Sequence, residues 1–359
     1  MERKHKRRLR NLLTLLLLLS ISSIAPGVTG VPTQKNTTLD PKIVANISSV
    51  TTTIQDAINN AQPNSTIILP AGTFTEILTI NKPLHLKGEG TTRTFLSPTS
   101  ANNGYAIRII AKGVTLSDLD ITNQGSGLYT TGVKISACNT TIQNCTFHDT
   151  PIGIAIWSSE NTISGCDFSA CDDEGIVLLG TSTSECHNNI ITSCTFHKNC
   201  DGIELQYATD NMITSCIFTQ NTHAGIDAIE SNNNNNIISH CEFSNNQGFG
   251  LYLARSSNNL ITQCTFSDDT ITFVQATENT LQKSQVTNIH LMQDSSLIIE
   301  QCEDIIPSDI ISHQSSFEIR TDQTEQISQE KNSHTTVYHS LLSNLLSRFK
   351  IVCRFLPTS

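Results

Sequence analysis

Acidic residues recur at fixed distances from a repeated glycine in the middle of the chain. They stand one or two places before that glycine, or two places after it, in three successive segments: Asp173, Glu174, Asp201, Glu204 and Asp227. Carboxylates gathered from neighbouring segments can act as a general acid and base, or can bind a hard cation such as calcium. The alternative is that Asp before Gly serves the turn and that Glu204 simply faces water. The spacing predicts these five acids as the candidate catalytic residues.

Aromatic and polar residues near these acids are candidate ligand-binding groups. Trp157, the only tryptophan, comes four places after its own glycine, and Tyr252 comes two places after another. A flat aromatic ring beside polar groups can stack on a sugar ring. His223 and Arg255 complete the candidate set. The alternative is that another segment covers the apolar strip to which Trp157 belongs.

A repeat of 20 to 28 residues must position these groups. Its anchor is a cysteine, in most segments with an asparagine five residues before it and a phenylalanine two residues after it. The anchors are Cys145, Cys166, Cys194, Cys216, Cys241 and Cys264, followed by Ser284 at the equivalent place. Self-similarity at this period is the signature of a repeat architecture.

Each repeat reads as short strands separated by Asn and Gly turns, which excludes a helical solenoid. Cys194 and Phe196 are predicted to point inward, as are Ile203 and Leu205 of a second strand. Parallel stacking places equivalent residues about 4.8 Å apart, so Asn amides can bond from unit to unit while Cys and Phe columns fill the core. We predict an all-β fold, a right-handed single-stranded parallel β-helix over residues 51–312. The Leu-x-Leu signature of leucine-rich repeats is absent.

The segment TTIQDAINNA predicts a short amphipathic helix before the first strand. Ile54, Ala57, Ile58 and Ala61 fall on one face of it. The end of a solenoid exposes its core and unpaired strand edges, so we expect this helix to cap it.

The stretch IQDAINNAQPNSTIILPAGTFTEILTINKPLHLKGEG, with the NxIxxCxF and DGIxL repeats, resembles the pectin-lyase-like superfamily. Within it, the similarity is to the NosD and CASH type (carbohydrate-binding proteins and sugar hydrolases), over residues 51–300. The resemblance implies the β-helix fold. It does not fix an activity, because this fold supports lyases, hydrolases, epimerases, adhesins and a copper-enzyme maturation factor.

Two activities of such relatives find little support in the residues. The polygalacturonase pattern is broken, because Asp172-Asp173 precedes Asn199-Cys200-Asp201-Gly202, His223 has no Gly-His-Gly setting, and no Arg-x-Lys follows. A polysaccharide lyase needs a base near the acids. The basic residues between positions 114 and 300 are only Lys134, Lys198, Arg255 and Lys283.

The resemblance also suggests copper binding, but the positions of the histidines do not support a copper site. They fall on different segments and faces, without a methionine cluster: His148, His197, His223 and His240. No CxxC motif supports a structural zinc site. We predict no metal and no cofactor, with calcium as the one cation that the acids could bind.

Twelve cysteines in an exported chain suggest that some of them form disulfide bonds. The six anchor cysteines are expected to be reduced and buried, because parallel stacked side chains rarely meet disulfide torsions. The other six are placed off the anchor column: Cys138, Cys171, Cys186, Cys200, Cys302 and Cys353. Of these, Cys171 and Cys200 are the best-placed pair for a disulfide.

The first thirty residues predict export. A basic stretch, an apolar run and small residues are typical of a secretory signal over residues 1–30, followed by a linker over residues 31–50. An uncleaved anchor is the alternative. Cleavage near Gly30 would remove six basic residues and one acid, changing the net charge from -10 to -15. Such a surface does not bind nucleic acid, and it disfavours anionic membranes and, less decisively, anionic polysaccharides.

The other end of the chain predicts a polar linker over residues 313–340 and an amphipathic segment over residues 341–359. That segment could dock on the β-helix or contact a membrane. We expect a secreted, periplasmic or cell-surface protein, and its oligomeric state stays open.

Three functions remain open at this point. The first is a protein that binds, or is displayed on, extracellular polysaccharide or other glycans. The second is a glycoside hydrolase or epimerase that acts through the acids. The third is a structural surface protein without a small ligand.

Overall fold

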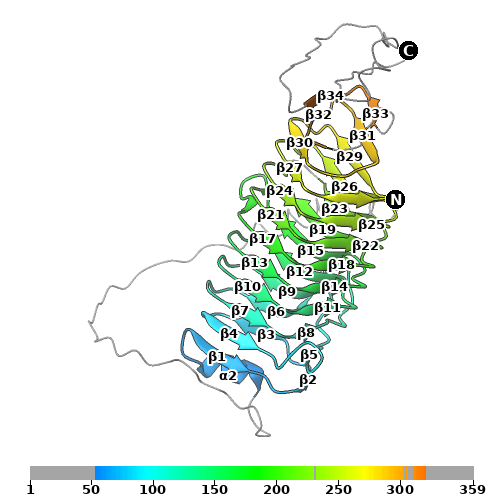
Figure 1. Cartoon of the computed structure of the whole chain (residues 1–359). Coiled ribbons are helices and arrows are strands. Elements are labelled where there is room, and N and C mark those ends of the chain that lie inside the picture. The colour runs from blue at the N-terminus through cyan, green and yellow to red at the C-terminus, as the bar shows by residue number, and fades with distance from the viewer. Residues whose placement is uncertain (1–52, 230–231, 303–304, 306–309, 321–359) are drawn as a thin grey trace, which may run out of the picture. The chain divides into compact units, whose positions relative to one another are not determined.

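The computed structural model describes residues 53–229, 232–302, 305 and 310–320. Three parallel sheets wind around one core, and successive strands of the chain join them in turn (Figure 1). This arrangement confirms the predicted right-handed parallel β-helix.

The first sheet, sheet A, contains β1 (Ser65–Ile68), β4 (Leu84–Lys87), β7 (Thr115–Ser117), β10 (Thr141–Gln143), β13 (Thr162–Ser164), β17 (Ile190–Thr192), β21 (Met212–Thr214), β24 (Ile237–Ser239), β27 (Leu260–Thr262), β30 (Asn279–Gln282), β32 (Ser296–Glu300) and β34 (Ser316–Arg320). Sheet B contains β2 (Gly72–Phe74), β5 (Thr94–Leu96), β8 (Asp120–Ile121), β11 (Thr146–His148), β14 (Asp167–Ser169), β18 (Thr195–His197), β22 (Ile217–Thr219), β25 (Glu242–Ser244) and β28 (Thr265–Ser267).

The third sheet, sheet C, contains β3 (Leu78–Ile80), β6 (Tyr105–Ile109), β9 (Thr131–Ile135), β12 (Ile152–Ile156), β15 (Glu174–Leu179), β19 (Asp201–Gln206), β23 (Ala224–Ala228), β26 (Phe249–Ala254), β29 (Thr270–Val274), β31 (Asn288–Met292) and β33 (Ile310–His313). A small additional pair joins β16 (Cys186–His187) to β20 (Ala208–Thr209).

The predicted helix before the first strand is present as α2 (Ile54–Asn60). Thr53 caps its N-terminus by accepting a hydrogen bond from the amide of Asp56. Ile54, Ala57 and Ile58 are buried and belong to the main core. The helix therefore covers the N-terminal end of the core, as expected.

The predicted asparagine ladder runs along the turns before sheet A. Each side-chain amide donates to the side-chain carbonyl of the next asparagine at 2.9–3.1 Å, through Asn161, Asn189, Asn211, Asn236, Asn259 and Asn279. Each of these carbonyls also accepts the backbone N–H of the residue one turn earlier. Buried polar groups are costly unless they are paired, and the ladder pairs them in every turn that it spans.

A second ladder was missed by the sequence analysis. Asn199, Asn221 and Asn246 bond in the same way, and Asp269 ends the series. These residues come three places after successive core phenylalanines, and that spacing was the available signal.

The core columns are also as predicted. Neighbouring phenylalanine rings stack at 4.4–4.9 Å between centroids, in the column Phe147, Phe168, Phe196, Phe218, Phe243 and Phe266. The anchor thiols are buried and free, and each donates to the carbonyl two residues before it at 3.3–3.4 Å.

Two predictions about the other cysteines are wrong. Cys302 lies in the anchor column after Ser284, whose backbone N–H donates to its sulfur. Cys171 and Cys200 are not joined by a disulfide. Burial raises the pKa of Cys171 and raises the pKa of Cys186 to about 12, so both stay protonated at neutral pH and are poor nucleophiles.

The β-helix extends past the predicted end at residue 312, because β34 ends at Arg320. Among the described residues, no helix has the length and apolarity needed to cross a membrane. The predicted signal, its linker, the amphipathic C-terminal segment and Cys353 lie outside the described residues.

Candidate functional site

The outward face of sheet C carries a column whose residue type changes from turn to turn. From β6 to β26 the strand registers place its members directly above one another, in the order Arg108, Lys134, Ala155, Val177, Glu204, Asp227 and Tyr252. We call this series the sheet C outer column. Beside it, Glu174 on β15 is in register with Asp201 on β19.

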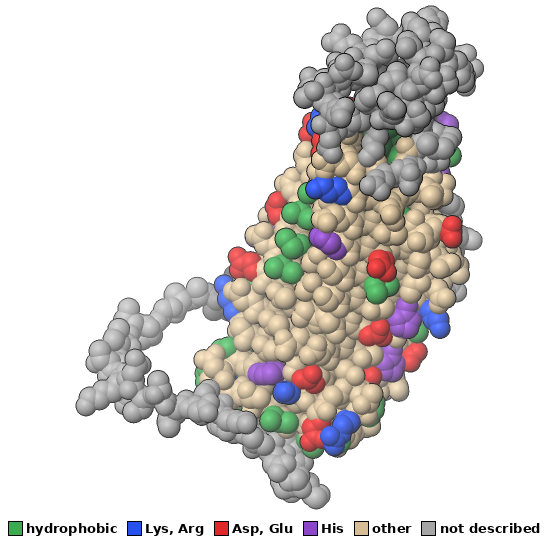
Figure 2. Space-filling model, in the orientation of Figure 1, with side chains coloured by type: hydrophobic (Ala, Val, Ile, Leu, Met, Phe, Trp, Pro, Cys, Tyr) green, Lys and Arg blue, Asp and Glu red, His purple; other side chains and the backbone are tan. Residues whose placement is uncertain are grey.

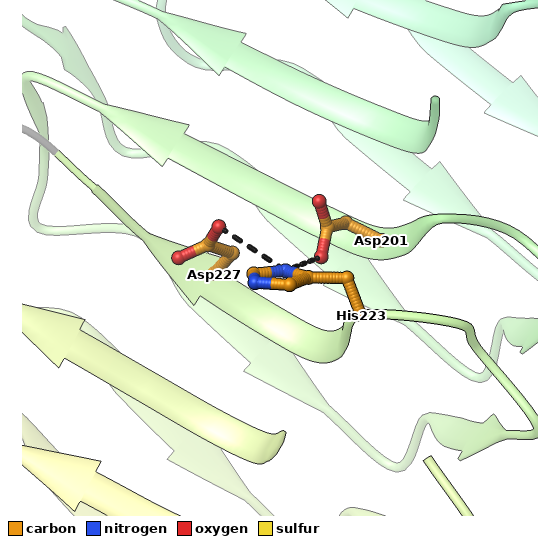
Figure 3. A group of neighbouring side chains, drawn as sticks. All are labelled: Asp201, His223 and Asp227. Atoms are coloured by element: carbon orange, nitrogen blue, oxygen red, sulfur yellow. Dashed lines mark hydrogen bonds and ion pairs between the residues drawn. The ribbon is translucent and has the colours of Figure 1, made fainter. Parts of the chain in front are cut away.

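Four carboxylates on three neighbouring strands meet one imidazole from the turn before β23 (Ala224–Ala228). Nδ1 of His223 lies 2.7 Å from Oδ1 of Asp201 and 3.6 Å from Oδ2 of Asp227 (Figure 3). One ligand atom each from Glu174, Asp201 and Glu204 also falls within 4.8 Å of the others. We call Glu174, Asp201, Glu204, Asp227 and His223 the acid cluster. Asp201 belongs to both groups and joins them.

The repeated glycine brings the strands of the cluster close to the core. A Cβ atom on Gly202 would lie 2.5 Å from the carbonyl oxygen of Gly225 and 2.7 Å from the ring of Phe218. A Cβ on Gly225 would meet the next turn in the same way. Only glycine fits this close approach, which fixes the backbone on either side of Asp201 and Asp227.

The four carboxylate residues are fully buried, with 0% of their surface exposed. The alternative in which Glu204 faces water is therefore wrong. One of its oxygens accepts a hydrogen bond from the side-chain amide of Gln206. Carboxylates held away from water are costly unless hydrogen-bond donors or cations accompany them.

Two aromatic rings border the acid cluster. The ring of Phe249 contacts His223 edge-on, with centroids 5.7 Å apart, and Tyr252 lies 4.9 Å from Phe249. Tyr252 was predicted, whereas Phe249 was not, although it stands one place before its glycine just as Glu174 and Asp201 do.

The remaining predicted residues lie apart from the acid cluster. Asp173 precedes β15, where its carbonyl accepts the N–H of Asp201, but its side chain is in neither potential ligand group. Arg255 is exposed, sits in a turn at φ 49, and pairs with none of the described carboxylates. Trp157 follows β12 and is 36% exposed, with Nζ of Lys134 5.1 Å from its ring centroid.

Two other histidines, His148 and His197, form separate contacts on sheet B. His148 bonds Asp120 and Asp149 at 3.0 and 2.8 Å, and His197 lies 3.4 Å from Asp167. On the face that Figure 2 shows, charged side chains stand singly or in small groups among other polar side chains. A histidine beside an acid is therefore not unusual in this protein. The acid cluster differs from these pairs because it contains four buried carboxylates beside its histidine.

The family described as "Periplasmic copper-binding protein (NosD)" matches residues 87–295, which is more than half of the chain. The chain belongs to the NosD family. The matched region includes the whole acid cluster and most of the strands of all three sheets. The resemblance inferred from the repeat is thereby confirmed.

Solved structures share the fold at low sequence identity. A mannuronic-acid-specific polysaccharide family 6 lyase from human gut microbiota is 12% identical, with a TM-score of 0.50, over 74% of this chain and 73% of its own. Tailspike protein 2 of Escherichia coli O157:H7 bacteriophage CAB120 is 14% identical, with a TM-score of 0.51, over 68% of this chain and 40% of its own. The mannuronan C-5 epimerase A-module of Azotobacter vinelandii is 13% identical, with a TM-score of 0.46, over 71% and 80%. A comparison with curated protein sequences finds no match.

The donor atoms of the acid cluster do not fit copper. Copper(I) sites in proteins use thiolate and thioether ligands and copper(II) sites use mainly imidazole nitrogen with some oxygen ligands, whereas a set dominated by carboxylates suits hard cations such as calcium. The potential ligand groups among the described residues contain carboxylates and one imidazole. The thiols of the anchor column point into the core and bond backbone carbonyls.

Proposed function

We propose that the protein is an exported, periplasmic β-helix that binds a glycan along the outward face of sheet C, at the acid cluster, and that binding uncovers the four carboxylates that are buried in the free protein. The observation that carries this proposal is the meeting of four buried carboxylates and His223 on three successive turns, with Phe249 and Tyr252 at the border. Carboxylates accept hydrogen bonds from sugar hydroxyls, and aromatic rings pack against the apolar faces of sugars.

The regular rise of the solenoid supports an extended ligand. Glu204, Asp227 and Tyr252 repeat at about 4.8 Å along the axis, which is close to the length of one sugar ring. A glycan chain that runs along the axis would therefore meet one new set of side chains with each sugar unit. The shared fold with a polysaccharide lyase agrees with a glycan as the ligand class.

The spacing of the carboxylates favours binding over one common form of hydrolysis. Inverting glycosidases hold their two carboxyl groups about 6.5–9.5 Å apart, to leave room for a water molecule. The ligand atoms of Glu174, Asp201 and Glu204 lie within 4.8 Å of one another. Such closeness suits shared hydroxyl groups or a hard cation such as calcium, which would bridge the acids and the sugar.

Turnover by a hydrolase or an epimerase is the second candidate, and one contact favours it. Asp201 holds Nδ1 of His223 at 2.7 Å, which orients the imidazole as an acid–base group is oriented in many enzymes. In this case the protein would release or alter sugars rather than only bind them.

A glycan-array screen, followed by binding measurements and product analysis, tests the proposal. The test variant is Glu204→Gln with Asp227→Asn, which keeps shape and removes charge. The control is Glu242→Gln with Asp268→Asn, because those acids are exposed and lie on the sheet B side. We expect the test variant to fold and to lose at least about tenfold in affinity, which is about 1.4 kcal/mol, while the control binds as the parent does. A test variant that binds like the parent would show that the ligand lies elsewhere, and released or epimerised sugars would favour the second candidate.

A further inference from the structure

The sheet C outer column begins with two basic residues on adjacent strands. Arg108 on β6 is in direct register with Lys134 on β9, so their Cα atoms are about 4.8 Å apart. Neither forms an ion pair with a carboxylate among the described residues. Other basic side chains do: Lys87 lies 3.7 Å from Asp118, and Arg93 lies 2.9 Å from Glu89.

Aromatic rings flank this basic pair. The guanidinium carbon of Arg108 lies 6.0 Å from the ring centroid of Tyr105, and Nζ of Lys134 lies 5.1 Å from that of Trp157. Contacts of this kind hold a cation in place without neutralising it. Burial and the charge of Arg108 both lower the pKa of Lys134. The two cations are therefore held side by side at a cost that a bound anion would offset.

The charge of the sheet C outer column changes sign along its length. After Lys134 come the uncharged Ala155 and Val177, and then Glu204 and Asp227. Glu204 is three strands beyond Lys134, a distance of about 14 Å along the axis. An anionic group is attracted at the first end and repelled at the second.

We propose that Arg108, Lys134 and Trp157 form a subsite for an anionic substituent of the glycan, a carboxylate, sulfate or phosphate. This inference rests on the proposed function, because the same glycan continues along the column to the acid cluster. A uniformly acidic polymer would place a negative charge over Glu204 and Asp227. The column therefore selects a glycan of mixed composition, with an acidic unit at the Arg108 end and neutral units, about three sugars further on, at the acids. The sign change also fixes the direction in which the chain lies.

The anion subsite can be tested without any glycan. Trp157 is the only tryptophan of the chain, so its fluorescence reports on the ring that contacts Lys134. Sulfate and inorganic phosphate, titrated at constant ionic strength against chloride, should change the Trp157 emission of the parent in a saturable way. The response should disappear in Arg108→Gln/Lys134→Gln. It should persist in the control Lys198→Gln/Lys283→Gln, whose lysines occupy turn positions at which Gln220 and Gln263 stand in other repeats. A parent without a response, or a test variant that keeps it, would overturn the subsite.

The glycan preference is tested with three matched oligosaccharides. The first is neutral, the second carries a single uronate at one end, and the third consists of uronate units throughout. The parent should bind the singly charged oligosaccharide about tenfold more tightly than the other two, a difference of about 1.4 kcal/mol. Arg108→Gln/Lys134→Gln should lose the preference over the neutral oligosaccharide and keep its affinity for that neutral form. Equal preference in parent and variant, or tightest binding of the fully acidic form, would contradict the proposal. If the parent responds to sulfate but binds no glycan, the proposed function fails while the anion subsite stands.

Discussion

The interior columns and the sheet C outer column belong to the same turns of the solenoid and have the same spacing, yet they differ in how residues repeat. Inside, one residue type recurs from turn to turn, as in the asparagine ladder and the phenylalanine stack. Outside, the sheet C outer column passes from basic to apolar to acidic to aromatic within seven strands. Residue type is thus constant along the interior columns and variable along the sheet C outer column.

Physical chemistry explains why the two columns differ. Stacked amides and aromatic rings stabilise their neighbours, so repetition favours folding. Like charges directly opposite one another are destabilising, as Arg108 is to Lys134 and Glu204 is to Asp227. The members of each pair therefore do not stabilise one another. The departure from the repeat is therefore the feature that indicates function.

The largest expected effect comes from a charge placed inside the phenylalanine column. Truncating a core aromatic to alanine costs about 3–5 kcal/mol, and Phe196→Asp would also bury a charge. We expect this variant not to fold, which circular dichroism and thermal unfolding would show. Thr195→Asp, on the outward side of the same strand, is the matched control and should fold. A normal thermal transition for Phe196→Asp would mean that the inward column is misassigned.

A smaller loss is expected in the asparagine ladder. The carbonyl of Asn211 accepts both the backbone N–H and the side-chain amide of Asn189, at 2.9 and 3.0 Å. Asn211→Ala leaves these buried donors without their acceptor, at a cost of about 2–4 kcal/mol. Chemical denaturation should show this loss, and it should show almost none for the exposed control Asn288→Ala. If the two variants were equally stable, the asparagine ladder would not stabilise the fold.

The outward acids should behave in the opposite way. Glu204→Gln with Asp227→Asn relieves repulsion between like charges, so we expect the free energy of unfolding to stay level or to rise by up to about 1 kcal/mol. The same denaturation measurement checks this. A loss as large as that of Asn211→Ala would mean that the acids are structural, and the contrast between the two columns would disappear.

The smallest effect concerns pH and His148 on sheet B. Burial acts to lower the pKa of His148, but its contacts with Asp149 and Asp120 outweigh burial and raise it above 6.5. The pKa of Asp120 is itself raised, because burial outweighs its contact with His148. A raised histidine pKa stabilises the fold below about pH 6.5, and this stabilisation is lost as pH rises through the folded pKa.

The thermal midpoint of the parent, relative to His148→Gln, should therefore fall between pH 5.5 and pH 8. The change corresponds to at most about 1 kcal/mol, because the pair is partly exposed. His240→Gln is the control. If the difference in thermal midpoint between the parent and His148→Gln stayed the same across this pH range, the contacts of His148 would add no stability.

The repeat pattern was sufficient to predict the fold. Cysteine, asparagine and phenylalanine at constant offsets could be explained only by stacking, and the structure places Cys194, Phe196 and Asn189 in the predicted columns. The second ladder is harder to predict, because Asn199 also fits a motif of catalytic relatives, and only its distance from Phe196 identifies it as a ladder residue. The C-terminal boundary was placed too early, although Phe317 and Ile319 alternate as strand residues do.

The candidate site was predicted only in part. Counting from the repeated glycine brought Glu174, Asp201, Glu204 and Asp227 together, because strand register follows the repeat. Counting could not predict their burial, since alternation places these side chains on the outward face. Nor could it predict that Lys134 contacts Trp157, because side-chain direction across strands depends on packing.

The most direct test of the central claim is a crystal structure of the protein with an oligosaccharide that binds it in the array. The account predicts that the sugar chain lies along the axis on the outward face of sheet C, with hydroxyl groups bonded to Glu204 and Asp227. A sugar bound on sheet A, on sheet B or at an end of the solenoid would contradict it, as would an array on which no glycan binds at all.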